Sequence, residues 1–481
     1  MPLPKLRSNS LLGNSFFIFI IRFFPSVANL VVLLYYSRQL DKTSYGNYQN
    51  FWIQLNIIAP IAYFGINALI TTYAPDAIAK LARTLNAKQY LLYGGWLVLL
   101  SLGFAWMQYH TLGIGFLVPF LFMFTFAAGI IIESFLVVFK NFRILSVINL
   151  LYSLCYVGIH KLVLDSGYTP YHLFLSLLLL NSARITISLV IARNNFKRFS
   201  SEDAELRSLR EIRTLWLHLG FYDVIQTFSM WIDKFFVSLL LTASLSAIYF
   251  NGTQNIPFLP IILSATGSAV LIQMAKVDAA DEKAYLRYLM NLSARYLSNI
   301  VFPLFFFLIF FRYELFGVLL PGYEASVPIF FVYLFMVPFR AYSFITVFQK
   351  LHKGHIGNIG AAGELVLASL LMYPLYKLFG LPGVMLSFII SSYTQCAFYF
   401  YHMSRLMETS AYHLVPVRNW LIKCIVFSLL FMILHYLVTS FFGAKISLMI
   451  GIGVMVITVL TALFVEITLQ KNGSNAAQKA I

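Results

Sequence analysis

Long apolar runs alternate with short polar segments along the whole chain of 481 residues. A helix needs about 20 consecutive, mostly apolar residues to cross a bilayer. Fourteen segments meet this requirement, and the pattern therefore predicts an all-α polytopic membrane protein with about 14 transmembrane helices. The candidate spans are residues 11–36, 48–73, 89–109, 113–139, 144–164, 171–192, 214–240, 245–275, 291–311, 325–349, 357–376, 381–404, 417–441 and 444–469.

The composition agrees with a protein that faces lipid. Hydrophobic residues make up 60% of the chain and charged residues only 11%, whereas a soluble domain carries about 25% charged residues. The net charge of +16 is typical of a membrane protein whose cytoplasmic loops are basic, so no nucleic-acid partner is expected. The cysteines, Cys155, Cys396 and Cys424, all lie in apolar runs. We therefore expect no disulfide, no metal site and no cofactor.

The charges between the spans predict the orientation. Of 34 Lys and Arg residues, 23 lie in alternate connecting segments that include both ends of the chain, Arg418 and Lys423 among them. Six lie in the opposite segments and five lie within spans. Lys and Arg collect on the cytoplasmic side, so both termini are predicted to be cytoplasmic.

The longest polar segment divides the chain into two blocks of six spans. Residues 40–74 align with residues 241–275 without a gap, with six identities that include Tyr48 with Tyr249 and Asn50 with Asn251. Such internal repeats are common in secondary transporters. The predicted parts are an N-terminal lobe (1–193), a basic cytoplasmic linker (194–213), a C-terminal lobe (214–404), and the last two spans with a cytoplasmic tail (405–481).

Polar side chains recur at helical spacing inside several spans. A polar group is costly in hydrocarbon, so it is expected to face the bundle interior or a hydrated cavity. The candidate residues are Arg22, Asn29, Asn56, Asn67, Asn181, Arg184, Asp223, Asp233, Lys234, Arg340 and Glu364.

Two roles are open for Arg22 and Arg184, which lie near the middle of their spans. They either line a cavity or form structural ion pairs, with Asp223 or Glu133 as partners. Arg binds phosphate well through paired hydrogen bonds. The excess of basic groups at this depth therefore favours an anionic passenger.

The remaining charged groups also have two interpretations. Asp233 and Lys234 point about 100° apart on a helix; they either bind solute or coupling ions, or lock the two blocks together. The asparagines of the second span either line a cavity or bond to neighbouring helices. Arg295 and Glu466 lie near span ends, where charged residues usually anchor a helix at the membrane surface.

The sequence does not indicate an enzyme. It contains neither a GxxxxGK[ST] phosphate loop nor an HExxH motif. It also has no large outer loop with a pair of acidic residues. Chemistry or binding is therefore expected within the helical bundle, as in a transporter.

Several short segments resemble the polysaccharide and O-antigen flippases of the MOP exporter superfamily. They are residues 36–50 (YSRQLDKTSYGNYQN), Phe64-Gly65, 231–235 (WIDKF), Ala247-Ile-Tyr249 with Pro257, and 320–325 (LPGYEA). The last segment has Pro-Gly where the family usually has an aromatic residue before glycine. Only Asp233 and Lys234 among the candidate residues fall on a family motif.

The resemblance implies two six-helix lobes in a V-shaped arrangement like that of the MATE transporters, with a C-terminal helix pair appended. It implies alternating access and an undecaprenyl-diphosphate-linked oligosaccharide as passenger, moved from the inner to the outer leaflet of the bacterial cytoplasmic membrane. The diphosphate would dock on Arg22, Arg184, Lys234 and Arg340. Asp223, Asp233 or Glu364 would bind H⁺ or Na⁺. A polysaccharide polymerase and assembly proteins are the implied partners.

Three alternatives are open. A cation-coupled multidrug exporter of the same fold would favour acidic residues in the cavity. A peptidoglycan-precursor flippase would share the basic cavity. A membrane-embedded glycan polymerase or acyltransferase would need a catalytic acid or histidine at a span end and usually a larger outer loop.

Overall fold

We describe the protein from a computed structural model. It describes residues 8–198, 208–254, 256, 282–342, 344, 347, 348, 351 and 353–479. Within helices, the side chains of residues 8–20, 22, 282, 340, 411 and 469–479 lie outside this description. The described residues are nearly all helical and include no strand.

The chain forms two compact units, Met1–Ala247 and Ile248–Ile481, which we describe separately. The helices of the first unit follow one another along the chain. They are α1 (Ser8–Gln39), α2 (Lys42–Tyr63), α3 (Ile66–Thr72), α4 (Pro75–Thr84), α5 (Ala87–Leu112), α6 (Leu117–Val138), α7 (Phe142–Asp165), α8 (Pro170–Arg198), α9 (Leu209–Leu240) and the start of α10 (Ala243–Gly252).

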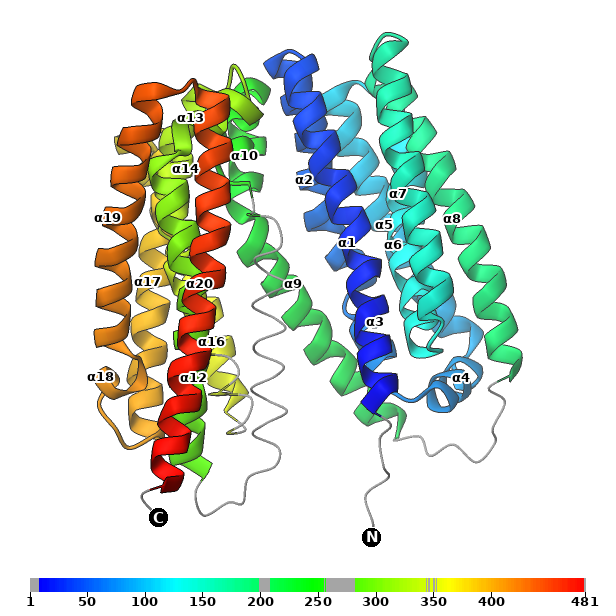
Figure 1. The fold of residues 1–481 in the computed structure, drawn as a ribbon. Coiled ribbons are helices and arrows are strands. Elements are labelled where there is room, and N and C mark those ends of the chain that lie inside the picture. Colours follow the sequence, from blue (N-terminus) through cyan, green and yellow to red (C-terminus); the bar gives the residue numbers. More distant parts are fainter. Residues whose placement is uncertain are drawn as a thin grey trace. The chain divides into compact units, whose positions relative to one another are not determined.

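Pairs of long helices pack against each other in the first unit. α1 lies along α7, α6 along α8, and α2 along α9 (Figure 1). Gly46 in α2 makes the last pairing possible near the end of α9. A Cβ atom at Gly46 would lie 1.8 Å from the carbonyl oxygen of Ala243, so no larger residue fits this contact without moving the backbone.

The second predicted span is broken rather than continuous. α2 and α3 meet at an angle of 54°, where Phe64 and Gly65 have positive φ values of 38° and 67°. Pro60 lies one turn before the break and weakens the helix there, because proline has no amide hydrogen. Trp216 of α9 donates a hydrogen bond to the carbonyl oxygen of Phe64 (2.7 Å), which stabilises the bend.

A buried aromatic cluster joins α1, α2 and α7. His160 Nδ1 lies 2.7 Å from the carbonyl oxygen of Tyr156, and a carbonyl only accepts. Nδ1 therefore carries the proton, and Nε2 accepts from the hydroxyl of Tyr48 at 3.1 Å. The hydroxyl of Tyr36 donates to the carbonyl oxygen of His160 (3.0 Å). These bonds satisfy polar groups away from water, as a bilayer requires.

The second unit has long helices and several short ones. They are α12 (Glu282–Phe310), α13 (Arg312–Leu319), η1 (Glu324–Ser326), α14 (Val327–Leu334), η2 (Pro338–Ala341), α16 (Gly354–Phe379), α17 (Leu381–Leu406), α18 (Ala411–Leu414), α19 (Val417–Phe441) and α20 (Ala444–Lys479).

Two packing arrangements organise the second unit. α16 and α17 pair along their length, and α12 packs against both α19 and α20 (Figure 1). The predicted tenth span is interrupted, because α14 ends at Leu334 and a 3₁₀ turn begins at Pro338. Of the predicted eighth span, residues 255 and 257–275 lie outside the described residues.

The helices have the length and apolarity of membrane spans. Among the described residues, nine helices meet both criteria, and the bent α2–α3 pair makes a tenth. Large apolar side chains such as Leu92, Leu370 and Phe464 are 66–70% exposed, as expected where the surrounding medium is lipid. The predicted all-α polytopic membrane fold is confirmed, and the chain is a multi-pass membrane protein.

Candidate functional site in the membrane-spanning helices

An ion pair joins two spanning helices of the first unit. Arg184 of α8 donates a hydrogen bond from Nη2 to Glu133 Oε2 of α6. The guanidinium also lies 4.8 Å from the ring centroid of Tyr152 in α7. The Arg184 and Glu133 side chains are 23% and 27% exposed. Of the two partners that the sequence left open for Arg184, the structure therefore has Glu133.

α1 also approaches this ion pair. Asn149 of α7 places its Nδ2 3.3 Å from Glu133 Oε1 and 3.3 Å from the carbonyl oxygen of Ile21. Four helices therefore meet around the Glu133 carboxylate. Arg22 follows Ile21 in α1, but the side chains of Arg22 and Arg340 lie outside the described residues.

The four candidate asparagines have different surroundings. Asn181 is buried and donates to Thr125 Oγ1 (3.2 Å), three residues before Arg184 on α8. Asn56 donates to the carbonyl oxygen of Trp52 in its own helix (2.8 Å). Asn29 is exposed. Asn67 Oδ1 is buried and accepts no hydrogen bond from the described residues. The structure therefore places only Asn181 beside Arg184.

α9 carries a second group of charges. Lys234 Nζ lies 3.3 Å from Asp233 Oδ2, and both side chains are largely buried. The Lys234 ammonium also lies 5.6 Å from the ring centroid of Trp231. Asp223, ten residues before Asp233 on α9, is half-buried. Arg184 and Lys234 therefore each have a carboxylate partner of their own.

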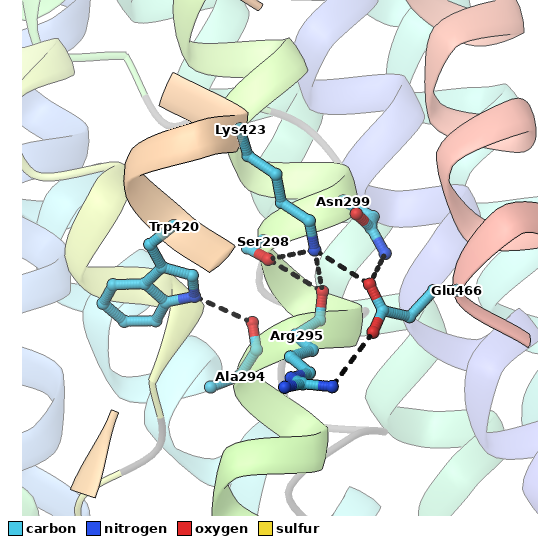
Figure 2. Close-up of polar contacts among 7 residues, drawn as sticks. All are labelled: Ala294, Arg295, Ser298, Asn299, Trp420, Lys423 and Glu466. Carbon is cyan, nitrogen blue, oxygen red and sulfur yellow. Dashed lines mark hydrogen bonds and ion pairs between the residues drawn. The ribbon is translucent and has the colours of Figure 1, made fainter. Parts of the chain in front are cut away.

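In the second unit, a buried charge cluster connects three helices (Figure 2). Lys423 of α19 donates to Glu466 Oε2 of α20 (3.1 Å) and to Ser298 Oγ of α12 (3.0 Å). Arg295 lies 3.9 Å from Glu466, and its side chain is half exposed. Sequence reasoning placed Lys423 among the cytoplasmic basic residues and Glu466 at a membrane surface. Lys423 and Glu466 lie at similar depths, near the same membrane side, in two neighbouring predicted spans. This similarity was the feature of the sequence that could have indicated the cluster.

Glu364, the last candidate, lies between the paired helices of the second unit. Its Oε1 accepts a hydrogen bond from Ser392 Oγ, which connects α16 to α17. Among the described residues, no group of three or more His, Cys, Asp or Glu side chains has the arrangement of a metal site.

The Arg184 guanidinium has more hydrogen-bond donors than Glu133 uses. A guanidinium has five N–H donors, and Glu133 occupies only part of this capacity. An incoming phosphate offers paired acceptor oxygens in the geometry that Arg prefers. Both side chains are also partly exposed, at 23% for Arg184 and 27% for Glu133.

The fold is similar to that of solved transporters, some of which belong to the MOP superfamily. Lipid II flippase MurJ in an inward closed conformation aligns with a TM-score of 0.65 and 13% identity, over 92% of this chain and 97% of that one. A MOP superfamily transporter from Pyrococcus furiosus aligns at 0.54 and 14% identity, over 82% and 94%. A MATE transporter from Vibrio cholerae aligns at 0.53 and 15% identity, over 82% and 98%. No protein-family model and no curated protein sequence matches the chain.

Proposed function

We propose that this protein is a transporter, not an enzyme, and that it moves an undecaprenyl-diphosphate-linked oligosaccharide from the inner to the outer leaflet of a bacterial cytoplasmic membrane. The observation that carries the proposal is the partly exposed Arg184–Glu133 ion pair between spanning helices. An ionised group at this depth marks a substrate or ion pathway more often than a neutral helix contact. The MOP exporter fold supports transport by alternating access.

The ion pair suggests how substrate is bound and released. Without substrate, Glu133 neutralises Arg184. The diphosphate of the passenger displaces the carboxylate and docks on Arg184, with Arg22, Lys234 and Arg340 as further cationic contacts. The glycan occupies a hydrated space within the helical bundle, whose proposed lobes are residues 1–193 and 214–404, while the prenyl chain stays in lipid. Asp223, Asp233 and Glu364 are the proposed ligands of a coupling ion, H⁺ or Na⁺.

A set of variants distinguishes substrate binding from a structural ion pair. Removing one partner of a buried pair leaves an unpaired charge and costs about 3–5 kcal/mol, whereas removing both costs less. We therefore compare Arg184→Gln, Glu133→Gln and the double variant in proteoliposomes that contain a lipid-linked oligosaccharide. The measurement is the fraction of glycan that reaches the opposite leaflet, at matched levels of folded protein.

If Arg184 binds the diphosphate, the double variant folds nearly as well as wild type but transports little. Glu133→Gln would keep the cationic group and show tighter substrate binding. Normal transport by the double variant would mean that the pair is only structural and would contradict the proposal. A change in the covalent structure of the glycan would instead identify an enzyme.

A second candidate substrate is a lipid-linked peptidoglycan precursor. The alignment with the lipid II flippase MurJ extends over 92% of this chain and 97% of that flippase. The same proteoliposomes with lipid II in place of the oligosaccharide test this candidate. Movement of lipid II alone would favour it, and movement of the oligosaccharide alone would favour the first.

A polymerase and assembly proteins are the proposed partners of an oligosaccharide flippase, to be sought by co-purification.

A further inference from the structure

An apolar groove of about 260 Å³ lies between three elements of the second unit. Its lining is formed by Phe302 and Phe305 of α12, Pro338 of η2, and Trp420, Leu421 and Cys424 of α19. Leu421 is 58% exposed and lies at the mouth of the groove. The groove therefore opens on the outer face of α19, most of whose apolar side chains are exposed.

Hydrogen bonds join α19 to α12 beside the groove. Trp420 Nε1 donates to the carbonyl oxygen of Ala294 (3.3 Å), and Lys423 Nζ donates to the carbonyl oxygen of Arg295 (3.0 Å) and to Ser298 Oγ (Figure 2). These three bonds fix one side of α19 against α12. The groove lies beside these bonds and is not filled by the packing of the two helices.

Atoms that line a void between apolar side chains have no partner on one side and lose dispersion contacts there. In a bilayer the medium at this surface is hydrocarbon, which is as apolar as the lining itself. A lipid chain therefore fits the groove better than water or a polar ligand does.

Arg418 adds a charge on α19 next to Val417, which lines the groove. It lies three residues before Leu421, so the two side chains share a face of α19. Arg418 is exposed, and no described residue forms a hydrogen bond or ion pair with its guanidinium. A basic residue next to an apolar groove near a helix end is suited to the phosphate of an anionic lipid.

We propose that this groove binds one acyl chain of an anionic membrane phospholipid, with the lipid phosphate on Arg418. The site is distinct from Arg184 and does not depend on the proposed transport function. The bound lipid would fill the space between α12 and α19 and stabilise the contact between them.

The test counts lipids that stay bound to the full-length protein. The protein is purified with phosphatidylglycerol or with phosphatidylcholine of the same chains, and retained lipid is measured by native mass spectrometry. Arg418→Gln should reduce the preference for phosphatidylglycerol about fivefold, the loss expected for one basic residue at a lipid surface. Arg405→Gln is the matched control, because Arg405 is an exposed arginine at the end of α17 that stacks on Tyr401.

Two further variants obstruct the groove. Cys424→Phe fills it from within, and Leu421→Trp covers its exposed mouth without disturbing the core. Both should reduce the retention of either lipid, whereas Ile425→Phe, on the exposed side of α19, should not. Equal retention by wild type, Arg418→Gln and Leu421→Trp would overturn the proposal. Displacement of the lipid by inorganic phosphate, or a retained polyprenyl lipid in place of phospholipid, would also overturn it.

Discussion

Trp216 and Phe64, 152 residues apart in sequence, are joined by a 2.7 Å hydrogen bond from the indole Nε1 to the main-chain carbonyl oxygen. The bond connects α9 to the break between α2 and α3. The rings of the two residues also meet edge to face, with centroids 5.9 Å apart. α9 carries Asp223, Asp233 and Lys234, so this contact fixes the charged helix against the bent span.

Gly220 and the Phe64 ring lie close together at the break between α2 and α3, so a methyl group added at Gly220 should have a large effect on stability. A Cβ atom at Gly220 would lie 2.4 Å from the Phe64 ring, so Gly220→Ala should destabilise the protein by about 1–3 kcal/mol through overpacking. Gly94→Ala in α5 is the control, because no atom lies within 4 Å of its Cβ position. It should gain about 0.5–1 kcal/mol from the lower flexibility of alanine. Thermal unfolding in detergent measures both, and equal effects would contradict this packing.

The charge cluster of the second unit predicts strong coupling between two residues. The Lys423 and Glu466 side chains are only 12% and 7% exposed, so Lys423→Met or Glu466→Gln alone should cost about 3–5 kcal/mol. The double variant should cost less than the sum of the two. The control is the pair Lys283–Glu408, whose exposed side chains should contribute at most about 1 kcal/mol. Additive losses at Lys423 and Glu466 in thermal unfolding would show that the two charges do not stabilise each other.

Much of the fold could be predicted because the bilayer imposes one simple requirement, a long apolar run for each crossing. Breaks within spans are harder to predict. Pro60 indicates a weak point, but the positive φ at Phe64 depends on Trp216 and Gly220 in a distant helix. The interruption of the tenth span likewise depends on how Pro338 packs among the helices of the second unit.

The site shows the same limit. Helical spacing identified Arg184 as a buried charge and left Glu133 and Asp223 as partners. Choosing between them requires the relative register of α6, α8 and α9, which a periodic pattern within one helix does not contain. From its position near the end of a span, Lys423 was also assigned to a basic cytoplasmic loop. In the structure, α19 turns this side chain toward Glu466. The substrate role of Arg184 stays a prediction until the double variant with Glu133→Gln is measured.

The turn between α1 and α2 predicts a pH dependence of stability. Asp41 caps α2 by accepting hydrogen bonds from the backbone amides of Thr43 (2.9 Å) and Ser44 (3.1 Å). Bonds from the side chain and amide of Ser44, and then from Thr43, lower the pKa of Asp41 below its usual 3.8. A lowered pKa in the folded state stabilises the protein above pH 3.8, and this stabilisation is lost as the pH falls below that value.

Three variants separate the capping bonds of Asp41 from its charge. Asp41→Ala removes the cap and should cost about 1 kcal/mol at pH 7. Asp41→Asn keeps an acceptor for both amides without a titrating group, so it should cost much less and should lack the acid-dependent loss that comes from this residue. Thermal unfolding of wild type and both variants between pH 3 and pH 7 measures the difference. If the wild type and Asp41→Asn lost stability in parallel below pH 4, the carboxylate of Asp41 would not be the source of the pH dependence.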